Sequence, residues 1–212
     1  MNRLAVRRPL RNPQPIFTET FRLKFGQPPL NPGYNMSSNS GGTLSVNIGD
    51  VPQVTNYSSL YTKYRILKAT FICLPQFVSQ SADINGAAYN QSLGLGAWGQ
   101  ARVITALQTS PDGGANPGSE EDVLQHNNCQ IHSGKSKLVL SCRPVPDLLD
   151  ANGNRVTARA PQFLNFENGA EGEIEHYGIK WWYTLPNLSP LVDTNVPIFV
   201  YCKLTFQLAD SR

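Results

Sequence analysis

The first residues that suggest a chemistry are four arginines near the start of the chain: Arg3, Arg7, Arg8 and Arg11. A guanidinium group is planar and matches the oxygens of a phosphate. Pro9, Pro13 and Pro15 keep this segment extended and non-helical, and it has too little apolar surface to fold alone. We therefore expect residues 1–15 to form a flexible cationic arm that contacts phosphates without reading base sequence.

The charge distribution agrees with such an arm. Residues 1–25 hold six basic residues and one acidic residue, whereas the rest of the chain holds 12 and 14. A basic segment on a nearly neutral body is typical of a protein that binds nucleic acid or an anionic membrane surface. Arg22 and Lys24 lie on the polar side of the first predicted strand and add to the phosphate contacts if that side faces the nucleic acid. Arginines gathered by chance in a solvated terminus are the alternative.

Three short motifs have the spacing of ligand sites: His126, Cys129 and His132; Asp150, Asn152 and Asn154; and Gly94, Gly96 and Gly99. The first lacks the fourth ligand of a structural zinc site. The second begins like a calcium loop, but its glycine comes too early and no glutamate follows at the twelfth position. The third is a formal GxGxxG without the βαβ unit that binds dinucleotides. With three histidines and no GxSxG motif, we expect no metal, no cofactor and no enzyme activity.

The elements that must position these residues are strands, because apolar and polar residues alternate along much of the chain. Eight such stretches are residues 17–25, 43–48, 63–74, 101–109, 129–133, 137–145, 173–185 and 196–209. Two short helices are predicted at 54–64 and 118–128, the second with Ser119 as its N-cap. The chain is therefore predicted to be all-β.

Long polar loops separate these strands: residues 26–42, 75–100, 110–128, 146–172 and 186–195. Hairpins use much shorter connections, so long loops indicate crossings between two sheets. We expect one eight-stranded antiparallel jelly roll over residues 16–212, with the first, eighth, third and sixth strands in one sheet. Its predicted core includes Phe21, Leu23, Phe71, Val200, Leu204 and Phe206.

The alternation also predicts which side chains share a face of each strand. In 63–74 the apolar face is Leu67, Ala69, Phe71 and Cys73, and the polar face carries Arg65, Lys68 and Thr70. In 173–185 one face is Tyr177, Ile179, Trp181, Tyr183 and Leu185. Aromatic residues in or near the loops, Tyr34, Tyr89 and Trp98, are the predicted anchors of contacts between subunits.

The four cysteines, Cys73, Cys129, Cys142 and Cys202, do not have the spacing of a disulfide framework. We expect free thiols and a reducing compartment. We see no secretory signal and no apolar run near the ~20 residues of a membrane span.

Three features resemble one known family. An arginine-bearing N-terminus runs directly into the first strand; Tyr64-Arg65-Ile66 is followed by Lys68 and Phe71; and an aromatic strand precedes an alternating last strand, 196–208. In these features the chain resembles the capsid proteins of small circular single-stranded DNA viruses that encode a Rep protein, the circovirus-like group.

The resemblance implies a jelly roll, self-assembly of about 60 copies into an icosahedral T=1 shell, and packaging of single-stranded DNA. It also implies a location in the virion, assembly in the host nucleus or cytoplasm, and a host receptor that the residues do not identify. The arm is shorter and poorer in arginine than is usual in that family, so either the inner face of the shell contributes to the neutralisation, the arm has been shortened, or solution cations make up the difference. The alternatives are a lectin-like binding sandwich, with Trp98 stacking on sugar, and an RNA-virus shell protein of the same fold.

Overall fold

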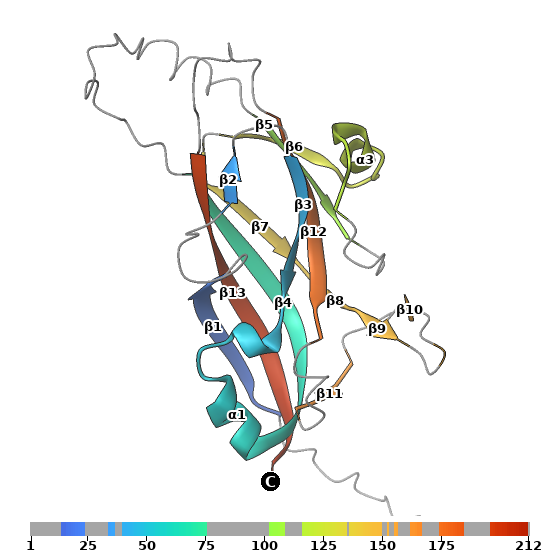
Figure 1. The fold of residues 1–212 in the computed structure, drawn as a ribbon. Coiled ribbons are helices and arrows are strands. Elements are labelled where there is room, and N and C mark those ends of the chain that lie inside the picture. The colour runs from blue at the N-terminus through green and yellow to red at the C-terminus, as the bar shows by residue number, and fades with distance from the viewer. Residues whose placement is uncertain are drawn as a thin grey trace, which may run out of the picture.

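A computed structural model describes the following parts of the chain: residues 14–23, 34–36, 40–75, 102–108, 116–134, 136–149, 152, 155–156, 162–166, 174–184 and 196–211. Within them, two antiparallel sheets face each other, and nearly all the long strands run along one common axis (Figure 1).

The first sheet holds four main strands in the order β1 (Ile16–Arg22), β13 (Val196–Ser211), β4 (Tyr61–Pro75) and β7 (Leu138–Cys142). Two short strands extend it, because β2 (Tyr34–Met36) pairs with β13 and β11 (Leu164–Asn165) pairs with β4. This is the predicted grouping of the first, eighth, third and sixth strands.

The second sheet has the order β3 (Ser40–Val46), β12 (His176–Thr184), β5 (Arg102–Leu107) and β6 (Gln130–Ser133), with β8 (Val145–Pro146) paired to β12. A separate hairpin joins β9 (Leu148–Leu149) to β10 (Arg155–Val156). The predicted jelly-roll arrangement is confirmed. Our prediction that 26–42 and 146–172 are loops throughout was wrong, because both contain short strands that pair with a neighbour.

The helices are shorter than predicted. A 3₁₀ turn, η1 (Ile48–Asp50), precedes α1 (Val54–Leu60), which ends where β4 begins. Helix α3 covers Glu120–Leu124, and its predicted N-cap is confirmed: the Ser119 hydroxyl accepts a hydrogen bond from the Asp122 amide at 3.3 Å.

The core lies between the sheets. All six predicted core residues are buried, and the rings of Phe17 and Tyr57 pack on Phe206. Glu19 interrupts the apolar face of β1, and the Tyr57 hydroxyl donates a 2.6 Å hydrogen bond to it. Burial, helped by this bond and by the charge of Glu19, raises the pKa of Tyr57 to about 12. Glu19 is thus tied to the core rim by a hydrogen bond.

Two predicted faces were each wrong at one residue because of a β-bulge, which adds one residue to a strand and reverses the facing of the residues beyond it. In β4, Leu67 is the extra residue, and Ile66 pairs with Phe206 on the core side. In β12 the register shifts between Tyr177 and Ile179, so Tyr177 lies opposite Ser45 on the outer side.

The second bulge has a reason in packing. Gly178 lies against the core, where a Cβ atom would come within 2.6 Å of the Cys142 sulfur. The shift also brings His176 to the core side, opposite Val46. His176 is buried, and its Nδ1 lies 3.0 Å from the carbonyl oxygen of Ile174. Burial lowers the pKa of His176 to about 4, although that hydrogen bond raises it. The imidazole is therefore neutral at pH 7.

Candidate nucleic-acid interface

The outer face of the first sheet carries a group of cations that the fold brings together. Paired residues of antiparallel strands point to the same side of a sheet. Arg22 lies opposite Tyr201, Lys68 opposite Thr205, and Arg65 opposite Gln207, while Lys203 lies between two threonines. Lys68 and Lys203 are diagonal neighbours, with Cα atoms about 8 Å apart. We call Arg22, Arg65, Lys68 and Lys203 the cationic face.

The neighbours of these cations are neutral. Thr18 and Thr205 exchange a hydroxyl hydrogen bond of 3.2 Å, and Thr70 and Ser141 one of 2.9 Å. Among the described outward-pointing residues of β1, β4, β7 and β13, one side chain is acidic. It is Asp210, at the end of β13. It forms an ion pair of 2.8 Å with Lys63. Within the described residues of this face, the acid therefore pairs with Lys63, which is outside the cationic face.

Aromatic rings lie beside two of the cations. The guanidinium carbon of Arg22 lies 4.2 Å from the ring centre of Phe199, and that of Arg65 lies 4.6 Å from Phe163. Gln207 Oε1 accepts hydrogen bonds from Nε and Nη2 of Arg65, at 2.8 and 2.5 Å. A cation held beside a partly exposed ring is a combination that can bind single-stranded nucleic acid, with phosphates on the charges and bases stacked on the rings.

The cationic arm starts at this same face. The Gln207 side chain donates a 3.2 Å hydrogen bond to the carbonyl oxygen of Gln14, and the Leu208 amide donates one of 3.1 Å to that of Pro15. These bonds fix the root of the arm beside Gln207, the residue that also holds Arg65. The four arginines of the arm lie outside the described residues.

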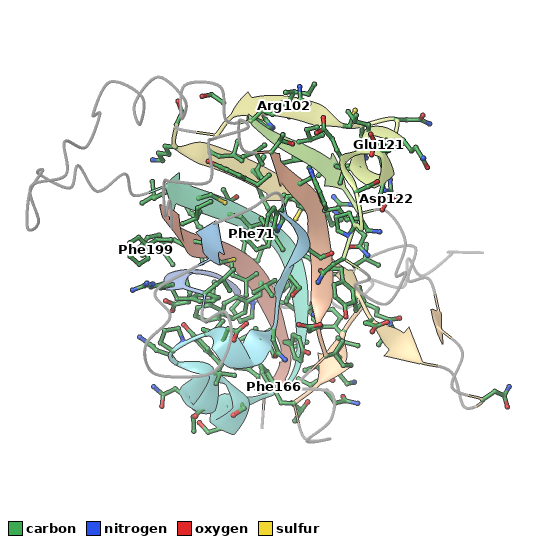
Figure 2. All side chains as sticks on the ribbon, turned by 45° about the horizontal axis from the view of Figure 1, so that its top comes forward. Phe71, Arg102, Glu121, Asp122, Phe166 and Phe199 are labelled. Carbon is green, nitrogen blue, oxygen red and sulfur yellow. The ribbon has the colours of Figure 1, made fainter. Side chains whose placement is uncertain are left out.

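The outer face of the second sheet is different. Helix α3 covers it, with Val123 buried against Ile104 and Ala106. The Glu120 carboxylate accepts hydrogen bonds from Arg102 at 2.6 Å and from Thr184 at 2.8 Å. Figure 2 shows Phe199 on one side of the molecule and the acidic residues Glu121 and Asp122 of α3 on the opposite side. Acidic side chains of α3 thus accompany the outer face of the second sheet, beside its cations Arg102 and Lys180.

The predicted site residues are only partly placed. Arg22 is exposed on the outer face, as predicted, and Lys24 lies outside the described residues. Sequence reasoning assigned Arg65, Lys68 and Lys203 to polar strand faces but did not combine them into one surface. The signal that would have found it is the order β1-β13-β4, which makes these three polar faces neighbours.

The other candidate motifs do not form a site in the described residues. The described ranges contain no cluster of three His, Cys, Asp or Glu side chains that could hold a metal ion. His132 instead lies 3.0 Å from the Thr105 hydroxyl, and burial lowers its pKa. Gly94, Gly96 and Gly99 lie outside the described residues, as do Asp150 and Asn154.

Other predictions concern the thiols, the membrane and the subunit contacts. All four cysteines are described, and none of them is in a disulfide. No helix in the described part of the chain is long and apolar enough to span a membrane. Tyr89, Trp98 and the side chain of Tyr34 lie outside what the structure describes, so their predicted role in subunit contacts stays a prediction.

No family model matches the sequence, and no curated protein matches it either. Solved structures do resemble the fold. The BFDV capsid protein, from a crystal structure of its 60-mer, gives a TM-score of 0.56 with 16% identity, over 94% of this chain and 96% of that chain. A chain from the X-ray structure of Melon necrotic spot virus gives 0.52 with 8% identity, over 94% of this chain and 56% of that chain.

A third similar structure is the semi-empty virus-like particle of the giant freshwater prawn Macrobrachium rosenbergii nodavirus, solved by cryo-EM. Its TM-score is 0.50, with 10% identity over 94% of each chain. All three structures are described as a capsid protein, a virus or a virus-like particle. The chain has the jelly-roll fold of viral capsid proteins.

Proposed function

We propose that this chain is the capsid protein of a small circovirus-like virus, that about 60 copies form an icosahedral shell, and that the shell packages single-stranded DNA. The observation that carries the proposal is that the arm begins at the edge of the cationic face. One side of the subunit therefore presents both the root of the arm and the cationic face to a polyanion.

The cationic face adds positive charge to that of the arm, which has few arginines. Four arginines at residues 3–11 are few for neutralising a packaged genome. Arg22, Arg65, Lys68 and Lys203 double the number of cations on that side of the subunit. In this arrangement the first sheet faces the interior of the shell, and helix α3 lies on the side away from the genome.

A second interpretation of the chain, as a shell protein for RNA, differs only in the nucleic acid that is packaged. Rings and cations recognise bases and phosphates of either nucleic acid, so a shell for RNA would use the same face. The fold likeness to the chain from Melon necrotic spot virus is compatible with this second reading. The lectin-like alternative differs in assembly, since it requires no particle.

The test is expression of the 212-residue chain and of a variant that lacks residues 1–12. Light scattering and electron microscopy measure particle size, and absorbance measures the nucleic-acid content. We expect particles from both chains, because the sandwich begins at β1, and much less nucleic acid in those without the arm. Digestion of the extracted cargo with DNase or RNase decides between the two cargoes.

Two results would overturn the proposal. A stable monomer or dimer across salt and pH would contradict shell formation and favour a binding module. Undiminished nucleic acid in particles that lack the arm would show that the arm does not take part in packaging.

A further inference from the structure

A cavity of about 480 Å³, which includes the solvent at its mouth, lies between the two sheets at the end where β4 finishes and β13 begins. Both sheets contribute apolar side chains to its wall, among them Leu44, Cys73, Val103, Leu138, Trp181 and Ile198. The cavity lies inside the sandwich and shares no residue with the cationic face.

Some core side chains at this end keep part of their surface exposed. Leu140, Trp181 and Ile198 keep 6–8% of their surface exposed, whereas Phe206 and Leu208 are completely buried. Apolar walls that lack partner atoms lose packing energy. A molecule that filled the space would recover those contacts, so the cavity favours an occupant.

The polar groups of the wall indicate which kind of occupant it favours. The Tyr183 hydroxyl donates to the carbonyl oxygen of Gly134 at 3.1 Å, and the Thr105 hydroxyl lies 3.0 Å from Nε2 of His132. Both hydroxyls are thus already engaged, and the described wall holds no charged side chain. Water needs two to four polar partners in such a site, and a peptide segment would bring backbone groups that need partners. A small apolar molecule needs neither.

We propose that this cavity binds one small, uncharged, hydrocarbon-like molecule, such as a single aromatic ring or a short alkyl chain. Ser133 and Ser136 border the cavity and are exposed, so the mouth accepts one neutral polar group. The site rests on the cavity alone and does not depend on the proposed packaging function.

The experiment uses toluene as the probe and the 212-residue chain with ¹³C-labelled methyl groups. Toluene should cause saturable NMR shifts at the methyls of Val103, Leu138 and Ile198 and leave that of Leu208 unchanged. It should also raise the melting temperature by about 2–4 °C near saturation, because a ligand that binds the folded state alone stabilises it by mass action.

A pair of variants on one strand makes the test specific. Leu138→Trp fills the cavity, while Val139→Trp places the same ring on the next residue of β7, which is exposed and points away. Toluene should no longer raise the melting temperature of the first variant and should still raise that of the second. If Leu138→Trp does not fold, Ser136→Trp, at the exposed mouth, gives the same test.

Three outcomes would overturn the proposal. They are an equal effect of toluene on both tryptophan variants, shifts that include Leu208 to the same extent, and shifts that do not saturate up to the solubility limit. Each would mean that toluene partitions into the protein without a defined site.

Discussion

The outer faces of the two sheets are both formed by antiparallel strands, but they differ in the residues and elements that lie over them. Beside β13, Lys68 and Lys203 are exposed among threonines. Beside β12, Ile104 is completely buried under helix α3, and Arg102 is paired with Glu120. One face is open and carries four cations, and the other is covered by a helix whose first turn is acidic.

The difference shows how a two-sheet domain can distinguish inside from outside in an assembly. An apolar outer face must be covered by the chain itself, and α3 does this for the second sheet. A polar, cationic face needs no such cover and stays available to a polyanion. The acids of α3 would repel phosphates, so the two faces have different partners in our proposal.

The largest effect is expected from a substitution in the core that holds the two sheets together. Phe206→Ala should lower the free energy of unfolding by about 3–5 kcal/mol, because the ring is completely buried between the sheets. Urea denaturation measures the loss. Ile16→Ala, on the exposed side of β1, is the control and should cost far less. Equal losses would mean that our assignment of the core is wrong.

Acid should weaken the sandwich without changing the charge of the cationic face. The pKa of His176 is about 4 in the folded chain and about 6.5 when unfolded. The unfolded chain therefore binds this proton more readily, and stability is lost as the pH falls from 6.5 towards 4, by up to about 3 kcal/mol.

Urea denaturation at pH 7 and pH 4.5 measures this dependence. His176→Gln keeps a hydrogen-bonding side chain but removes the titration, so its stability should change less between the two pH values. The same pH dependence in the variant and the parent would assign the effect to other groups.

The rings of the cationic face should contribute to binding of single strands. Phe199→Ala should weaken the affinity for a pyrimidine oligonucleotide by about 1–3 kcal/mol if a base stacks there. Phe199→Tyr keeps the ring and should bind like the parent chain. Fluorescence anisotropy with a labelled oligonucleotide measures the affinity of both variants. An unchanged affinity of the alanine variant would show that base stacking on Phe199 does not contribute to binding.

The smallest effect is expected on the covered face. Ser119→Ala removes the N-cap of α3 and should cost about 1 kcal/mol of stability. Because α3 lies away from the cationic face, the affinity for the oligonucleotide should stay the same. Parallel thermal melts and anisotropy titrations check this, and a loss of affinity would contradict the separation of the two faces.

The sheets were predictable because alternation along a strand records which side is buried. β13 alternates from Ile198 to Leu208, and its core face is as predicted. The bulges at Leu67 and before Ile179 were not predictable, since an extra residue changes the register without changing the composition. The short strands β2 and β11 were missed because three or two residues carry no periodic signal.

The candidate site was predicted in part for a similar reason. The arm shows in the local composition, so Arg3, Arg7, Arg8 and Arg11 could be proposed from the sequence, and their role stays a prediction. The cationic face combines Arg22, Arg65 and Lys203 from three strands that are distant in sequence. No local window contains it, and it appears once the strand order is known.

The most direct test of the central claim is the salt dependence of binding to single-stranded DNA, measured on the chain that lacks residues 1–12. Two double variants remove the same charge: Lys68→Gln with Lys203→Gln on the cationic face, and Arg102→Gln with Lys180→Gln on the second sheet. Each phosphate contact contributes about 0.7 to the slope of log affinity against log salt. We predict that the first pair lowers the slope by about 1.4 and that the second leaves it unchanged. Equal slopes for the two pairs would contradict a nucleic-acid interface on the first sheet.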